Sequence, residues 1–266
     1  MRVALVQLAY DDAESPPDRL ERVTSLVSGL AGHDLIVLPE LWYAGGFSYR
    51  QWPEYAQGLD GTVAQRLCEL AESLGCILHG GSIVERGPLG PEGKDLWNTS
   101  LVFGPDGQQW AAYRKIHRFG FATGEPELME AGDAMVTVEL FDQDAGDFVA
   151  GLSTCYDLRF PELYRAQLDA GATVFLIPAA WPAARVEAWR TLLRARAIED
   201  QCLVIACNTA GTHARTPMGG HSAVIAAGGE VLAEAGTQEQ VLSVEVDVDE
   251  IAKTRESFPV LQDRRL

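Results

Sequence analysis

The stretch DFVAGLSTCYDLRFPELYRAQL (147–168) combines an apolar run, a short turn and a helical segment. Its first part, 147–155, contains Phe, Val, Ala and Leu and predicts a buried strand that ends at Cys155. Proline is favoured in the first turn of a helix, so Pro161 indicates a helix over 161–170. A strand followed at once by a helix is typical of α/β domains. A cysteine between the two would project from the edge of a sheet.

The same alternation of apolar runs and amphipathic segments continues along the whole chain. Strands are expected at 2–9, 34–40, 76–84, 98–104, 147–155, 173–180, 202–209, 222–227 and 240–248. Helices are expected at 18–31, 61–75, 161–170 and 187–201. Short turns between consecutive strands, such as 222–227 and 240–248, indicate antiparallel pairs and hence mixed sheets. No Ser-, Gly- or Pro-rich linker divides the chain, which predicts one domain over residues 1–266.

The composition excludes several classes of protein. The chain has 266 residues and a formal charge of −17, from 21 Lys and Arg against 38 Asp and Glu, which disfavours binding to nucleic acid or to anionic membranes. Neither a signal peptide nor a membrane span is visible, so a cytoplasmic protein is expected. Five cysteines without a CxxC pair predict neither a disulfide framework nor a zinc site. Walker and GxGxxG motifs are absent, so no nucleotide cofactor is expected.

Three residues at the ends of apolar runs could carry chemistry. Cys155 on its turn could act as a nucleophile. Glu40 ends DLIVLPE (34–40) and precedes LWYAGGF, where desolvation would raise the carboxyl pKa toward the range of a general base. Lys115, in YRKIHRFGF (113–121), could donate to an oxyanion. Taken singly, each residue also has a simpler interpretation without a catalytic role. Cys155 could be a buried structural cysteine, Glu40 a loop carboxylate that faces water, and Lys115 a surface lysine.

Together these segments resemble a known family. PE at 39–40, YRKIH at 113–117 and CYDLRFPE at 155–162 resemble the three signature regions of the nitrilase-like carbon–nitrogen hydrolases. The likeness continues through 181–211, 219–236 and 258–265. It implies a Glu–Lys–Cys triad at Glu40, Lys115 and Cys155, a four-layer α-β-β-α sandwich with two mixed sheets, and no metal or organic cofactor.

The resemblance also implies further site residues. A family glutamate often lies seven residues before a Gly-Asp pair, which here is Gly132-Asp133 and points to Glu125. Glu127 and Glu130 are neighbouring alternatives for that accessory role. In ordinary acyl transfer, the backbone N–H of Tyr156 would share the oxyanion with Lys115.

The segments around 155–165, 181–185 and 192–199 look most like the omega-amidase branch, with amidases of deaminated glutathione close by. This implies that ammonia is released from a small carboxylate-bearing amide through a thioester. A substrate carboxylate needs a cation, and Arg185 and Arg159 are candidates. Aromatic residues that could shape the pocket are Tyr43, Phe47, Phe121 and Trp181. Carbamoyl-amide and nitrile hydrolysis by the same triad remain alternatives.

Two readings from other classes are also open. A papain-like enzyme would pair Cys155 with a histidine, for which His117, His213 and His221 are available. A catalytically silent relative would serve as a binding or scaffold subunit. The family resemblance further implies a homodimer or higher homo-oligomer, with a C-terminal tail over about 256–266 that reaches the partner.

Overall fold

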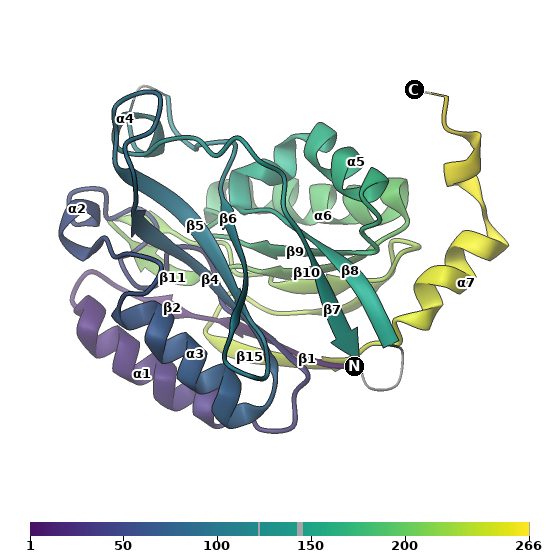
Figure 1. The fold of residues 1–266 in the computed structure, drawn as a ribbon, viewed down its shortest axis with the longest axis horizontal. Coiled ribbons are helices and arrows are strands. Elements are labelled where there is room, and N and C mark those ends of the chain that lie inside the picture. Colours follow the sequence, from purple (N-terminus) through teal and green to yellow (C-terminus); the bar gives the residue numbers. More distant parts are fainter. Residues whose placement is uncertain (122, 143–145, 266) are drawn as a thin grey trace.

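The computed structural model describes residues 1–121, 123–142 and 146–265 (Figure 1). Within these residues, two six-stranded sheets and one small three-stranded sheet form. The first sheet has the order β15 (Gln240–Glu245), β1 (Arg2–Gln7), β3 (Leu35–Val37), β4 (Ile77–Arg86), β5 (Leu96–Phe103) and β6 (Gln109–Arg114). The second has the order β14 (Val231–Glu234), β13 (Ala223–Ile225), β10 (Leu203–Cys207), β9 (Val174–Pro178), β8 (Gly146–Leu152) and β7 (Thr137–Asp142). The small sheet joins β12 (Thr216–Pro217), β11 (Ala210–His213) and β2 (Ala9–Tyr10).

Both large sheets are mixed, as expected. In the first sheet, β1, β3 and β4 run parallel, whereas β15, β5 and β6 pair antiparallel to their neighbours. In the second sheet, β8, β9 and β10 run parallel, and β7, β13 and β14 are antiparallel. Parallel strands meet with their carboxyl ends at one edge, and in α/β sheets this edge is where ligand sites form.

Helices cover the outer face of each large sheet, which gives four layers (Figure 1). Helices α1 (Pro16–Ser28) and α3 (Thr62–Leu74) pack on the first sheet, and α5 (Pro161–Asp169) and α6 (Val186–Asp200) pack on the second. Side chains alternate across each strand, so β1 directs Val3 and Leu5 toward the second sheet and Ala4 and Val6 toward α1 and α3. The α-β-β-α sandwich implied by the family resemblance is confirmed.

The remaining elements are short or peripheral. They are the helices α2 (Trp52–Tyr55), α4 (Glu125–Leu128) and α7 (Asp249–Ser257), and the 3₁₀ turns η1 (Cys155–Arg159), η2 (Ala183–Arg185) and η3 (Val260–Asp263). The expected tail over 256–266 begins in α7 and extends away from the sandwich (Figure 1), and its residue 266 lies outside the described residues. No helix in the described part of the chain is both long and apolar enough to cross a membrane.

One expected strand pairing is wrong. The segments 222–227 and 240–248 do not pair with each other, because β13 pairs with β14 and β15 instead joins the first sheet beside β1. β14 has no counterpart among the expected strands, and its hairpin with β13 turns at Gly229 with φ +89°. That hairpin fills the position beside β13, so the next strand is free to cross to the other sheet.

Candidate active site

Glu40 lies three residues beyond the carboxyl end of β3. Its side chain is 3% exposed and points its two oxygens in different directions. Oε1 accepts hydrogen bonds from Nζ of Lys115 at 2.7 Å and from Nδ2 of Asn98 at 2.8 Å. Oε2 accepts from the backbone N–H of Ala180, after β9, at 2.8 Å. Glu40 therefore connects the first sheet to the second.

The backbone before Glu40 is held by a close approach to Gly81. A Cβ atom at Gly81 would lie 1.9 Å from the carbonyl oxygen of Pro39, and the residue has φ +67°. Only glycine adopts that conformation without strain and leaves that space. On the other side, the backbone N–H of Leu41 donates to Oγ of Ser82 at 3.1 Å. A side chain at position 81 would thus displace the segment that carries Glu40.

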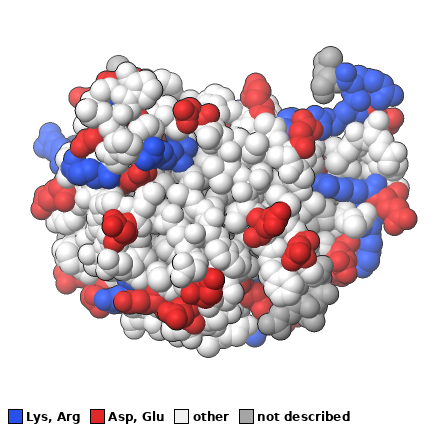
Figure 2. Space-filling model, in the orientation of Figure 1, with Lys and Arg blue, Asp and Glu red and all other residues white. Residues whose placement is uncertain are grey.

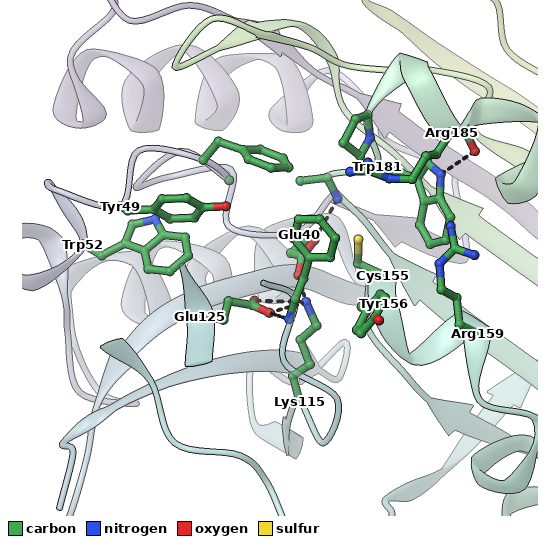
Figure 3. Close-up of a pocket in the computed structure, with 15 residues that line it drawn as sticks. Glu40, Tyr49, Trp52, Lys115, Glu125, Cys155, Tyr156, Arg159, Trp181 and Arg185 are labelled. Carbon is green, nitrogen blue, oxygen red and sulfur yellow. Dashed lines mark hydrogen bonds and ion pairs between the residues drawn. The ribbon is translucent and has the colours of Figure 1, made fainter. Parts of the chain in front are cut away.

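Lys115 follows β6, and its ammonium group lies between two carboxylates (Figure 3). Nζ donates to Oε1 of Glu40 at 2.7 Å and to Oε1 and Oε2 of Glu125 at 2.9 and 3.0 Å. Burial alone would lower the pKa of Lys115, but the charges of Glu125 and Glu40 outweigh it and hold the pKa well above its usual value. Lys115 is therefore charged at neutral pH.

Of the three glutamates considered for the accessory role, Glu125 is the one that contacts Lys115. It is buried at the start of α4, and Oε2 also accepts the backbone N–H of Phe119. Burial raises the pKa of Glu125 above its usual value, while Lys115 opposes that shift. Glu127 is exposed, and Glu130 instead accepts the backbone N–H groups of Glu92 and Lys94, each at 2.9 Å.

Cys155 begins the turn η1 directly beyond β8, with φ +48° and 7% exposure. This left-handed conformation is held by Asp157, whose Oδ2 accepts the backbone N–H of Thr154 at 2.9 Å. The sulfur lies beside Glu40 on the pocket wall (Figure 3). Burial, with a further contribution from Glu40, raises the pKa of the Cys155 thiol well above its usual value. The thiol therefore keeps its proton at neutral pH.

These groups line one pocket. Its wall contains the four groups Glu40, Lys115, Glu125 and Cys155, the aromatic residues Phe47, Tyr49, Trp52, Phe119, Tyr156 and Trp181, and the arginines Arg159 and Arg185. The Arg159 guanidinium lies 4.8 Å from the centre of the Trp181 ring, and that of Arg185 lies 5.1 Å from the Phe119 ring. In the described residues neither arginine has a carboxylate partner.

Two aromatic residues expected at the pocket do not line it. Tyr43 is buried on the α1 and α3 side of the first sheet, with its ring 6.0 Å from that of Tyr55. Phe121 is 83% exposed and lies beyond Phe119, which takes the place on the wall. Gly120 separates the two phenylalanines with φ +142°, so successive side chains do not follow a simple alternation there. Phe47 and Trp181 do line the pocket.

Several site residues were missed from the sequence, and Asn98 is the most connected of them. It begins the segment expected as a strand at 98–104. A polar residue before an apolar run usually indicates the start of a strand, so Asn98 was not considered a site residue. The other missed residues are Tyr49, Trp52, Phe119, Ala180 and Pro182. A signal for Asn98 did exist, since a fully buried strand of the first sheet has few reasons to contain a carboxamide.

The histidines available for a papain-like pair do not line this pocket in the described chain. His117 places Nδ1 2.8 Å from Oδ1 of Asp157 and stacks on Phe160, and His213 stacks on Tyr10. His221 places Nδ1 3.2 Å from Oε1 of Glu234. Within the described residues, no group of three or more His, Cys, Asp or Glu side chains could hold a metal ion.

Comparison with known proteins gives the family. The Carbon-nitrogen hydrolase model matches residues 2–256. A 2-oxoglutaramate amidase from Paenarthrobacter nicotinovorans is 47% identical over 263 residues, which cover 99% of this chain and 89% of that protein. A 2-oxoglutaramate amidase from Bacillus subtilis (strain 168) is 36% identical over 94% of this chain and 92% of that protein. The crystal structure of a CN-hydrolase superfamily protein from Xanthomonas campestris, with an arsenic adduct in its active site, matches with a TM-score of 0.89 at 33% identity, over 100% of this chain and 97% of that one. This confirms the family expected from the signature regions, and the chain belongs to the carbon–nitrogen hydrolases.

Proposed function

We propose that this chain hydrolyses the terminal amide of a short carboxylate-bearing acid, such as 2-oxoglutaramate, through a thioester on Cys155. The observation that carries the proposal is the contact of Lys115 with Glu40 beside the Cys155 thiol, in a pocket that also holds two arginines. The similar proteins named 2-oxoglutaramate amidase support the choice of substrate class. Carbamoyl amides and nitriles are the alternative substrates of the same groups.

In the first half-reaction, Glu40 acts as the base. Its Oε1 already accepts two hydrogen bonds, whereas Oε2 accepts one, so Oε2 is the oxygen with a lone pair available for the thiol proton. Sulfur then attacks the amide carbon, and the negative charge that develops on the amide oxygen is stabilised by Lys115 and by the Tyr156 backbone N–H. When the carbon–nitrogen bond breaks, Glu40 returns its proton to the leaving nitrogen, and ammonia is released.

In the second half-reaction, water cleaves the thioester. Glu40 takes a proton from the water as its oxygen attacks the acyl carbon, and the same two donors stabilise the oxyanion. The carbon–sulfur bond then breaks, the thiol regains its proton from Glu40, and the carboxylic acid leaves. Glu125 holds the Lys115 ammonium in place through this cycle, because both of its oxygens contact Nζ.

The far end of the substrate is proposed to bind Arg159 and Arg185. Arginine suits a carboxylate because its planar guanidinium can donate two parallel hydrogen bonds. The formal charge of the chain is −17, and acidic side chains are spread over the face in Figure 2, so an anionic substrate meets an unfavourable overall field. Two cations on the pocket wall oppose that field locally. The pocket wall, which combines aromatic side chains with a few charged groups, also suits a small molecule.

The test is ammonia release from a matched panel of amides. Succinamate and butyramide share the amide and the chain length, and only succinamate carries a distal carboxylate. We expect turnover of 2-oxoglutaramate and succinamate, with loss of turnover in Cys155→Ala. Carbamoyl compounds and nitriles belong in the same panel, because turnover of these with silence toward the ω-amides would replace the proposed substrate class.

Arginine variants separate binding of the carboxylate from the chemistry. We expect Arg185→Leu and Arg159→Leu to lower kcat/KM for succinamate by about 10- to 100-fold each, the value of a hydrogen bond to a charged group. Butyramide turnover should change far less. Equal losses for both amides would contradict a carboxylate site at these residues.

We also propose that the chain forms a single domain, assembles as a homodimer and resides in the cytoplasm. The shared core between the two sheets supports one domain over 1–266 with a tail over about 256–266. We propose a homodimer that buries the exposed Ile198 of α6 and Phe258 of the tail, which are 50% and 67% exposed in one chain. Light scattering of the full chain and of a Phe258→Ser variant tests the dimer. A cytoplasmic location is proposed as well, and cell fractionation tests it.

A further inference from the structure

Asn98 is a buried residue of β5 that contacts the catalytic groups without lining the pocket. Its side-chain Nδ2 donates to Oε1 of Glu40 at 2.8 Å and to Oε1 of Glu125 at 2.7 Å. Its backbone carbonyl accepts the N–H of Lys115 at 2.8 Å. Because Asn98 is 3% exposed, all three contacts lie away from solvent. One strand residue therefore binds both carboxylates and the segment that carries the ammonium.

The orientation of the Asn98 amide follows from its neighbours. Both N–H groups of Nδ2 face carboxylate oxygens, and a flipped amide would set its carbonyl oxygen against the same two carboxylates. Oδ1 is buried and has no hydrogen-bond partner among the described residues. A buried acceptor without a partner costs stability. The amide therefore lacks a partner on its acceptor side, while both of its N–H groups bind carboxylates.

The surrounding charges explain why these donors matter. Glu40 and Glu125 share one buried cation, Lys115, so the cluster has one negative charge in excess when both carboxylates are ionised. Two carboxylates that share a site compete to hold a proton. Of the other titratable groups that face the pair, Cys155 keeps its proton. Burial, followed by the charges of Glu125 and Glu40, raises the pKa of Tyr49 to about 12, and burial raises that of Tyr10, so both tyrosines stay neutral.

We propose that Asn98 is a positioning residue that keeps both carboxylates ionised near neutral pH and directs Oε2 of Glu40 toward the thiol. With Asn98 and Lys115 on Oε1, that oxygen has no lone pair left for the thiol proton. Without Asn98, the pair takes up a proton at a higher pH, and a protonated Glu40 cannot accept the proton of Cys155. This inference rests on the role proposed above for Glu40.

The test compares pH profiles of kcat/KM for the wild type and for Asn98→Ala. We expect the acid limb of the profile to move up by about one to two pH units, since each lost hydrogen bond to a charged group changes the ionisation equilibrium by about 10- to 100-fold. Activity at neutral pH falls accordingly and partly recovers as the pH rises. A residue with a merely structural role would lower activity equally at every pH.

Thr99→Val is the matched control. Thr99 is the next residue of β5, is fully buried, and donates through Oγ1 to Oε2 of Glu85 at 2.5 Å on the other face of the strand. The variant thus also removes a neutral donor from a buried carboxylate, but one outside the site. Its acid limb should coincide with that of the wild type. Should the alanine variant not fold, Asn98→Asp keeps the size of the side chain. Because it adds a third carboxylate, it should shift the acid limb of the pH profile upward by at least as much as Asn98→Ala.

A second readout needs no substrate. The rate at which iodoacetamide alkylates Cys155 depends on proton transfer from the thiol, so its pH profile should shift upward in Asn98→Ala by the same amount. Coincident alkylation profiles and coincident acid limbs in wild type and variant would overturn the inference. If the wild type releases no ammonia from any amide, the proposed function fails, and the alkylation profiles still decide the role of Asn98.

Discussion

The two sheets contribute opposite kinds of group to one pocket. The first sheet supplies Glu40, Lys115 and Asn98, which are charged or polar and bind one another. The second supplies Cys155, a neutral thiol on a left-handed residue, held by a hydrogen-bond network around Asp157. Charge is therefore stabilised by charge on one side, and backbone conformation by hydrogen bonds on the other. The difference predicts that variants on the two sides will fail in different ways.

The largest effect is expected on the side of the second sheet. Cys155→Ala removes the proposed nucleophile, and we expect kcat to fall by roughly 10⁶-fold, the loss typical of removing a catalytic nucleophile. Because the thiol is neutral and makes no ion pair, the free energy of unfolding should change by only about 1 kcal/mol. Ammonia release and urea unfolding of the same preparation measure both quantities.

Lys115→Ala makes the matching change on the side of the first sheet. It removes one proposed oxyanion donor, and such a loss typically costs about 10²- to 10³-fold in kcat. It also leaves two buried carboxylates without their cation, so the free energy of unfolding should fall by about 3–5 kcal/mol. A Lys115→Ala protein as stable as Cys155→Ala would show that the pairing of charges in the first sheet is not what stabilises the site.

Changes in the hydrogen bonds of Asp157, which hold the turn at Cys155, are expected to lower activity less. Each oxygen of Asp157 accepts two contacts, Oδ1 from the backbone N–H and Nδ1 of His117, and Oδ2 from the hydroxyl of Tyr113 and the N–H of Thr154. Asp157→Asn turns an NH₂ group toward some of these donors and loosens the turn. We expect kcat/KM to fall by about 10- to 100-fold. In contrast to Asn98→Ala, the acid limb of the pH profile should not move.

The pH profiles of Asp157→Asn and Asn98→Ala test most directly whether the two sides of the pocket differ as proposed. If the acid limb moves in Asp157→Asn as far as in Asn98→Ala, the two sides are not electrostatically separate. Tyr113→Phe is the control, because it removes one of the four contacts and keeps the carboxylate. Its loss of activity should be smaller than that of Asp157→Asn.

The smallest effect concerns the pH dependence of stability. Burial lowers the pKa of His79, beneath the Glu40 segment, to about 4, while the unfolded chain has the usual value of about 6.5. The unfolded state therefore binds more protons below pH 6.5, and stability falls as the pH drops from about 6.5 toward 4. We expect His79 to account for up to about 2 kcal/mol between pH 6.5 and 5.

His79→Asn isolates this contribution. Asparagine cannot titrate, and its side-chain oxygen can replace Nδ1 of His79 as the acceptor for the N–H of Gly81. Urea unfolding at pH 7, 6 and 5 should show a smaller loss of stability in the variant than in the wild type. Parallel losses in the two proteins would mean that His79 is not the group that titrates.

The signature segments predicted that Glu40, Lys115 and Cys155 lie together, because each follows a strand end that sequence patterns reveal. Glu40, Lys115 and Cys155 all stand just beyond apolar runs, and the fold brings these ends together. Asn98 was missed because its contacts depend on how β5 lies in the sheet, 58 residues from Glu40 in sequence. The sequence pattern can mark Asn98 as an unusual polar residue of a buried strand, but it does not show which groups the side chain contacts.

The pocket wall was predicted less well for a related reason. Tyr43 and Phe121 belong to the expected segments, but the direction of a side chain in a loop depends on single backbone angles such as that of Gly120. The pairing of β15 with β1 in the first sheet was not predicted. It depends on β14 taking the place beside β13, which the sequence around β15 does not reveal. Elements with strong periodicity were predicted, and orientations in loops were not.

The central claim is that the thiol of Cys155 carries the acyl group. The most direct measurement is the mass of the protein quenched in acid during turnover of 2-oxoglutaramate, followed by mapping of the modified peptide. We predict an adduct equal to the substrate minus ammonia on the peptide that contains Cys155, and neither adduct nor ammonia from Cys155→Ala. Continued ammonia release by Cys155→Ala, or an acyl adduct on another residue, would contradict the mechanism.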